Sequence, residues 1–139
     1  MSNLINWFTR KKLFVISFLG AVVFFVGNFV DISIPVDVCY QEGFCGDISE
    51  ALMVYFLIFL PFFIFSLITT KLKDSIFFTW RNFSLWALPI SFLFISFFPT
   101  FTHGMDFLPI IKGTVSYTLA IVYSIISLIL IIYKSLKKE

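Results

Sequence analysis

Residues Leu13–Val30 read LFVISFLGAVVFFVGNFV, an apolar stretch without a single charge. Eighteen helical residues rise about 27 Å, close to the roughly 30 Å hydrocarbon core of a bilayer. Three basic residues precede the stretch, as they do in a secretory signal peptide. However, the stretch is longer than the usual 7–15 apolar residues of such a peptide, and no small-x-small cleavage site follows it. We therefore expect an uncleaved transmembrane helix.

Three more apolar stretches follow at about Ile48–Thr69, Phe83–Phe98 and Thr114–Tyr133. Together with the first, they predict an all-α fold, a four-helix transmembrane bundle with short loops. The third stretch is the shortest. Because Arg81 can snorkel toward the headgroups, this helix is also compatible with an earlier start, near Ile76 or Trp80.

The composition predicts that residues 1–139 form a single integral membrane domain. The chain is 60% apolar and 13% charged, whereas soluble domains are about 45–50% apolar and about 25% charged. The charges lie between or outside the apolar stretches. The basic excess therefore points to the lipid bilayer as the partner and not to nucleic acid.

Charged residues gather on alternate sides of the four stretches. One side carries two acids and nine basic residues, namely Arg10, Lys11, Lys12, Lys71, Lys73, Arg81, Lys134, Lys137 and Lys138. The other side carries Lys112 and six acids, namely Asp31, Asp37, Glu42, Asp47, Glu50 and Asp106. Short loops rich in Lys and Arg stay in the cytoplasm. We therefore predict that both termini are cytoplasmic.

Local signals add detail to the predicted helices. Asp47 and Glu50 have the spacing of a capping box, which predicts a helix start at Asp47. Pro61 should kink the second helix, and Pro89 should lie within the first turns of the third. Trp80 and Trp86 suit an interfacial aromatic belt on the cytoplasmic side.

Small residues form two stripes at helical spacing. Gly20 and Gly27 share one face of the first helix, with Ser17 beside them. The last helix carries a second stripe of Ser116, Ala120, Ser124 and Ser127. Such stripes let helices approach closely. We expect both to be helix-packing seams, either against each other or against a second copy of the chain.

The two cysteines lie in VCYQEGFC, on the side opposite the basic clusters. In an oxidising compartment Cys39 and Cys45 should form a disulfide that staples the first outer loop. A thiol–disulfide relay and free or intermolecular thiols are the alternatives. Known four-span disulfide-exchange proteins use Cys-x-x-Cys and a second cysteine pair, and neither is present.

No metal, cofactor or catalytic group is predicted. His103 is the only histidine, and with Asp106, Asp37, Glu42 and Asp47 it makes a poor zinc set, because structural sites need four ligands and catalytic ones about three. Phosphate loops, GxSxG and HExxH motifs are absent from the sequence. We therefore expect a protein that is not an enzyme.

Ionisable residues are also missing from the interior of the predicted spans. Such residues usually mark ion pathways, proton relays or substrate sites. Their absence argues against a proton-coupled transporter, a pump or a voltage sensor. It leaves open a pore lined by hydroxyls and backbone, and a lipid-binding groove.

The stretch WRNFSLWALPISFLFISFFPTF, Trp80–Phe101, combines an aromatic entry, a Trp-x-Leu-Pro step at Trp86–Pro89 and a terminal Pro99. With the ending IIYKSLKKE, this half of the chain resembles small uncharacterised four-span membrane proteins of reduced-genome bacteria. The resemblance implies the bacterial cytoplasmic (inner) membrane as the location. It implies no activity and no functional residue.

Three functions remain in competition. The first is a non-enzymatic membrane protein that acts through helix association, as an accessory subunit of a membrane protein partner or as a homo-oligomer. The second is a subunit of a small-solute or lipid channel or carrier. The third is a thiol–disulfide redox protein that uses Cys39 and Cys45.

Overall fold

A computed structural model describes residues 9–33, 44–99 and 111–137, and its regular secondary structure within these ranges is helix, without strands. The predicted all-α class is therefore confirmed for this part of the chain. The helices are α2 (Arg10–Ser33), α4 (Phe44–Phe56), α5 (Phe59–Thr70), α6 (Asp74–Ser96) and α7 (Lys112–Leu136).

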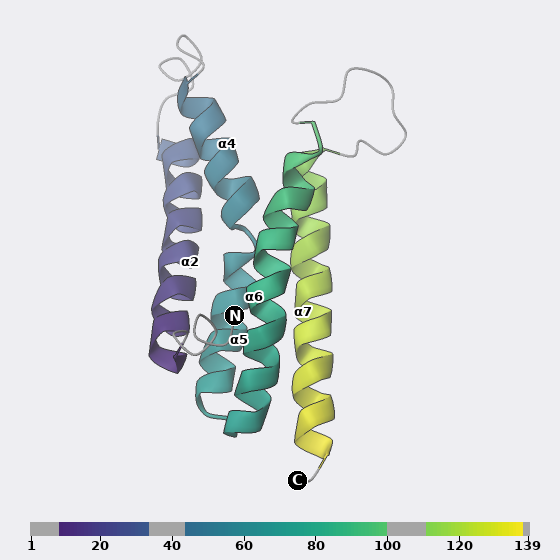
Figure 1. Ribbon diagram of the computed structural model, residues 1–139. Helices are drawn as coiled ribbons and strands as arrows, with labels where there is room; N and C mark the ends of the chain where they lie inside the picture. Colours follow the sequence, from purple (N-terminus) through teal and green to yellow (C-terminus); the bar gives the residue numbers. More distant parts are fainter. Residues whose placement is uncertain (1–8, 34–43, 100–110, 138–139) are drawn as a thin grey trace.

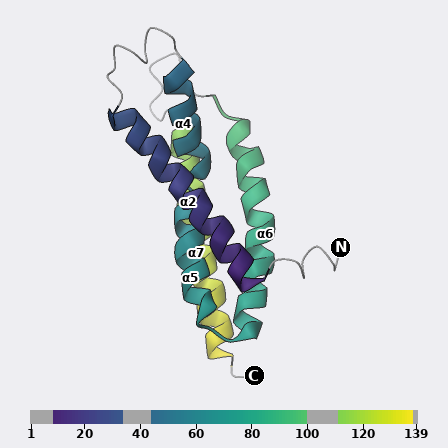
Figure 2. The same cartoon turned by 90° about the vertical axis from the view of Figure 1, so that its left-hand side faces the viewer.

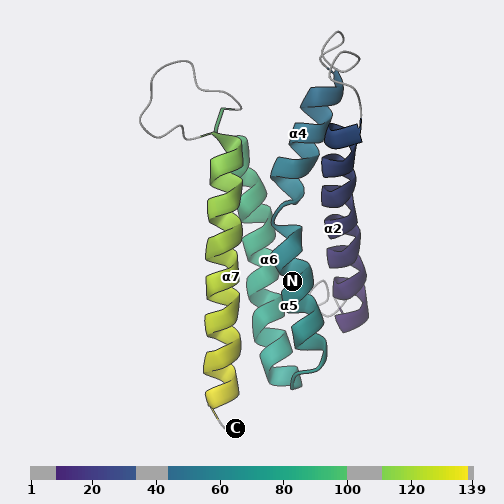
Figure 3. The same ribbon diagram turned by 180° about the vertical axis from the view of Figure 1, so that it is seen from behind.

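The helices run side by side along a common direction (Figure 1). α4 and α5 follow one another as a central broken rod, which α2 crosses at an angle (Figure 2). α6 packs along α7 on the other side of this rod, as the view from behind also shows (Figure 3). The start of α2, the turn between α5 and α6 and the end of α7 lie at one end of the bundle. We call this the basic end, because seven lysines and arginines of the described residues lie in these three segments.

The second apolar stretch is two helices, separated at Leu57 and Ile58. Pro61 causes the break, because it has no N–H to donate to the carbonyl of Leu57 and its ring clashes with that carbonyl. The Leu57 carbonyl instead accepts from Leu60 in a tighter turn, at 3.1 Å. The predicted kink at Pro61 is confirmed. The predicted helix start at Asp47 is wrong, since α4 begins at Phe44.

The helix of the third stretch begins at Asp74, well before Phe83. Of the two expected starts, the structure has the earlier one, near Ile76, and not the one at Phe83. Pro89 consequently lies in the second half of α6 and not in its first turns. Arg81 lies inside the helix, only 6% exposed, with its guanidinium 4.8 Å from the centre of the Phe78 ring. Arg81 lies before the predicted third stretch, and the earlier start of α6 includes it in the helix.

Aromatic side chains fill the contact between α5, α6 and α7. Phe62 stacks on Trp80 with ring centres 5.6 Å apart, and Phe83 stacks on Tyr123 at 5.5 Å. Trp80 is fully buried in this cluster. The prediction that Trp80 belongs to an interfacial belt is therefore wrong.

Arg10 joins the start of α2 to the turn between α5 and α6. Its guanidinium donates to the carbonyl oxygens of Thr70 at 2.7 Å and Leu72 at 2.9 Å, and it forms an ion pair with Asp74. It also lies 4.9 Å from the centre of the Phe77 ring. A cation at this place is favourable, because the last carbonyls of α5 carry partial negative charge.

The bundle keeps small polar residues inside and large apolar residues outside. Its buried polar side chains are mostly hydroxyls, namely Ser17, Ser66, Thr69, Ser84, Ser91, Ser116 and Ser127. Large apolar side chains are exposed along α2, α5, α6 and α7. Soluble monomers rarely expose contiguous apolar surface on this scale, whereas membrane helices bury small residues at their contacts.

Among the described residues, three helical segments are long and apolar enough to cross a membrane, namely Arg10–Phe29, Glu50–Thr70 and Lys112–Leu136. They indicate a membrane protein. α6 is not among them, although it has 23 residues. Arg81 and Asn82 lower its average hydropathy, and of these two side chains Arg81 is buried within the bundle while Asn82 is exposed.

Candidate functional site: a groove between α6 and α7

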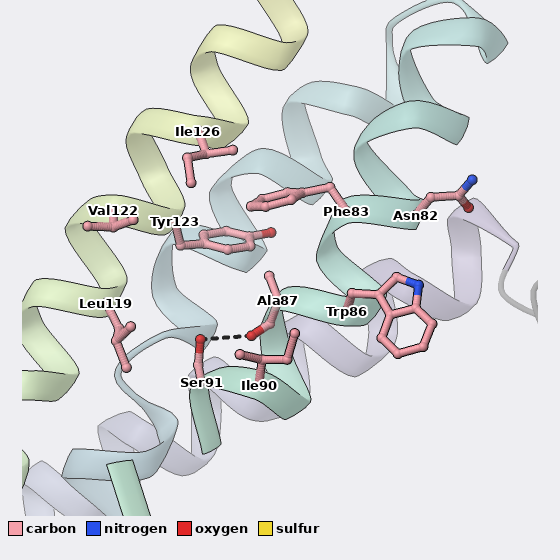
Figure 4. A pocket seen from close by; sticks show the side chains of 10 residues that line it. All are labelled: Asn82, Phe83, Trp86, Ala87, Ile90, Ser91, Leu119, Val122, Tyr123 and Ile126. Atoms are coloured by element: carbon pink, nitrogen blue, oxygen red, sulfur yellow. Dashed lines mark hydrogen bonds between the residues drawn. The ribbon is translucent and has the colours of Figure 1, made fainter. Parts of the chain in front are cut away.

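A groove of about 600 Å³ lies on the outer side of the α6–α7 pair, halfway along both helices. We call it the α6–α7 groove (Figure 4). Ten side chains line it: Asn82, Phe83, Trp86, Ala87, Ile90, Ser91, Leu119, Val122, Tyr123 and Ile126. The first six come from α6 and the last four from α7. Its volume is within the range of ligand pockets, about 300–1,000 Å³, but it is a lateral groove and not an enclosed cavity.

The groove exists because α6 carries small residues where it faces α7. Ala87 and Ser91 are four residues apart and therefore lie on the same face of the helix. Trp86 and Ile90 rise beside them and are both more than half exposed. In Figure 4 these two side chains form a ridge along one side of the groove, with Leu119, Val122 and Ile126 on the opposite side.

The hydroxyl groups of the groove are already hydrogen-bonded. Ser91 donates to the carbonyl oxygen of Ala87 at 2.8 Å. The Tyr123 hydroxyl is 2.8 Å from that of Ser84, behind the floor of the groove. One helical turn away, the indole N–H of Trp80 donates to Ser127 at 3.3 Å. Apart from the Asn82 amide at one end, the groove thus presents apolar surface, and its lining contains no acid, lysine, arginine, histidine or cysteine.

A second, smaller groove of about 310 Å³ lies between α5 and α7, next to the break at Leu57. Pro61 and Ile64 line it from α5, and Ala120 and Ser124 line it from α7. The Ser124 hydroxyl donates to the carbonyl oxygen of Ala120 within α7. This groove is also apolar.

The residues of the predicted packing seams contact different helices. Gly20 lies against α5, where a Cβ atom at this position would come within 2.1 Å of the Phe59 ring. Gly27 is also buried on α2. Ser116 donates to the Val54 carbonyl of α4, and Ser127 accepts from Trp80 of α6. Gly20, Ser116 and Ser127 thus contact neighbouring helices of the bundle, whereas Ala120 and Ser124 line the open groove between α5 and α7.

Several predicted features lie outside the described residues. Cys39 is among them, and so are His103, Asp106, Asp37 and Glu42, while only the backbone of Cys45 and Asp47 is described. The disulfide between Cys39 and Cys45 stays a prediction. The described part of the chain holds no group of three or more His, Cys, Asp or Glu that could bind a metal ion.

Comparison of the chain with models of protein families, with curated proteins and with solved structures gives no match. The resemblance to small four-span bacterial membrane proteins therefore stays a prediction. The α6–α7 groove was missed in the sequence, although the Ala87-x-x-x-Ser91 spacing is the small-x-x-x-small pattern of membrane helix contacts.

Proposed function

We propose that this chain is a four-span membrane protein that acts through helix association, as a homo-oligomer or as an accessory subunit of another membrane protein. It has both termini in the cytoplasm, and we place it in the bacterial cytoplasmic membrane. It is not an enzyme in this proposal, and the α6–α7 groove is the surface through which it associates.

Two observations support α6 as the fourth helix that crosses the membrane. The turn between α5 and α6 is short, and α6 runs back along the bundle beside α7 (Figure 1). The backbone N–H of Lys112 donates to the carbonyl of Pro99, so the end of α6 meets the start of α7. A helix that returns to the far end of the bundle and exposes apolar residues there fits a transmembrane helix.

The groove lining is the observation that carries the proposal. It is apolar, it lies halfway along the helices, and its hydroxyls already have partners. Such a surface has no group poised for acid–base or nucleophilic chemistry. It does have the small-residue floor and the large apolar ridge that let a further helix pack closely.

Crosslinking in native membranes, followed by purification of the tagged chain, tests this function. We expect crosslinked species heavier than the 16.1 kDa chain, containing either a second copy or one reproducible membrane protein. A chain recovered only as a monomer, without a co-purifying protein, would contradict the proposal.

A further inference from the structure

Asn82 differs from Asn28, the other asparagine whose side chain the structure describes. Within the part of the chain that the structure describes, its amide makes no hydrogen bond. Asn28, the other asparagine of this part, donates to the Phe24 carbonyl of its own helix at 3.0 Å. The hydroxyls of Ser91 and Thr118 likewise bond the carbonyl four residues earlier. Asn82 instead lies exposed at one end of the α6–α7 groove.

This position makes the lack of a partner costly. Asn82 is eight residues into α6, about 12 Å along the helix from Asp74. A polar group that faces hydrocarbon without a hydrogen bond is unfavourable by several kcal/mol. An amide carries both a donor and an acceptor, so its partial charges are complementary to those of an identical amide. The same asparagine of a second copy is therefore a suitable partner.

The surface around Asn82 is also self-complementary. Asn82, Trp86, Ile90, Leu93 and Phe97 follow one another at spacings of four, four, three and four along α6. All five are exposed. This spacing makes one stripe of the kind that packs against a second helix by knobs into holes. The ridge of Trp86 and Ile90 lies directly beside the groove, so one patch holds both a protrusion and a hollow, as a two-fold interface needs.

We infer that the α6–α7 groove is the interface of a two-fold homodimer, in which the Asn82 amides of two copies pair near the axis and the Trp86–Ile90 ridge of each copy packs into the groove of the other. The inference rests on the proposed function and selects its homo-oligomer form. A single asparagine in an apolar seam also selects register and oligomeric state, because any other pairing leaves the amide without a partner.

Dimerisation can be measured as energy transfer between donor- and acceptor-labelled full-length chains in lipid vesicles, at decreasing protein-to-lipid ratio. We expect Asn82→Ala to weaken dimerisation about tenfold, as for interhelical polar contacts in membranes. Asn82→Gln keeps donor and acceptor and should retain most of the affinity. Asn28→Ala is the matched control and should change it less than about twofold, because that amide bonds its own helix.

Two further pairs of variants locate the interface. Ala87→Leu fills the α6–α7 groove and should weaken dimerisation, whereas Ala120→Leu fills the other groove and should not. With Cys39 and Cys45 replaced by serine, Ile90→Cys should crosslink two copies in membranes, and Ile121→Cys should not.

The outcomes separate this inference from the proposed function. A dimer that is indifferent to Asn82→Ala and crosslinks through Ile121→Cys would overturn the inference but leave association as the function. A chain that stays monomeric in vesicles would overturn the inference, and the native-membrane crosslinking would then decide between an accessory subunit and failure of both.

Discussion

Arg10 is the side chain that connects the most distant parts of the sequence at the basic end. It bonds two carbonyls of the α5–α6 turn and pairs with Asp74. Because Asp74 is largely exposed, the ion pair itself contributes little, and the bonds to the carbonyls dominate. We expect Arg10→Ala to lower the free energy of unfolding by about 1–2 kcal/mol, measured by SDS titration in mixed micelles.

The controls for Arg10 separate geometry from charge. Arg10→Lys keeps the charge but cannot present several donors in one plane, so it should recover only part of the loss. Lys11→Ala removes a neighbouring charge and should have almost no effect. Equal losses for Arg10→Ala and Lys11→Ala would show that the contact to the turn is unimportant.

The Ser84–Tyr123 pair is the shortest buried hydrogen bond between α6 and α7, at 2.8 Å. In a double-mutant cycle of Ser84→Ala and Tyr123→Phe we expect a coupling of about 0.5–1 kcal/mol, as for other hydrogen bonds between membrane helices. A cycle of Ser84→Ala with Thr118→Ala is the control, since Thr118 is exposed and bonds its own helix. Zero coupling between Ser84 and Tyr123 would show that this hydrogen bond does not contribute to the contact between α6 and α7.

At the scale of the element, a hydroxyl of α7 supplies a hydrogen bond that the break between α4 and α5 removes. The Ser116 hydroxyl donates to the Val54 carbonyl, which in an unbroken helix would accept from Ile58. Pro61→Ala restores a donor, and we expect α4 and α5 to join. Ser116→Ala should then destabilise the natural chain by about 1 kcal/mol and the Pro61→Ala chain by less, measured as unfolding free energies. Equal losses in both backgrounds would show that the hydroxyl does not compensate for the break.

At the scale of the whole molecule, the topology depends on whether α6 crosses the membrane. With four crossings, alkaline phosphatase should be active when fused after Gly104 and inactive when fused after Leu72 or Leu136, because only the first fusion point lies outside the cytoplasm. If α6 does not cross, the fusion after Leu136 becomes active and the one after Gly104 inactive. Green fluorescent protein fused after Leu136 is the control. It should be fluorescent where phosphatase fused at the same position is inactive, and dark where phosphatase is active.

Much of the fold follows from local sequence patterns. Uncharged apolar runs of membrane length predict helices, as for α2 and α7, because a chain in hydrocarbon must satisfy its backbone hydrogen bonds internally. Pro61 predicts its kink because the missing N–H is a local property. The helix starts were less predictable. α6 begins as early as Asp74 because the side chains of Arg81 and Ser84 are buried against other helices. Such burial depends on contacts with residues that are remote in the sequence.

The sequence by itself determined the helical class, the kink and the segregation of basic residues, since each depends on residue type and short-range spacing. Only the tertiary structure decided that Trp80 is buried while Trp86 is exposed, that Arg10 closes on the α5–α6 turn, and that Ala87 and Ser91 open a groove beside Asn82. These features depend on which faces of two helices meet, and that choice is made by packing between residues 39 to 64 positions apart.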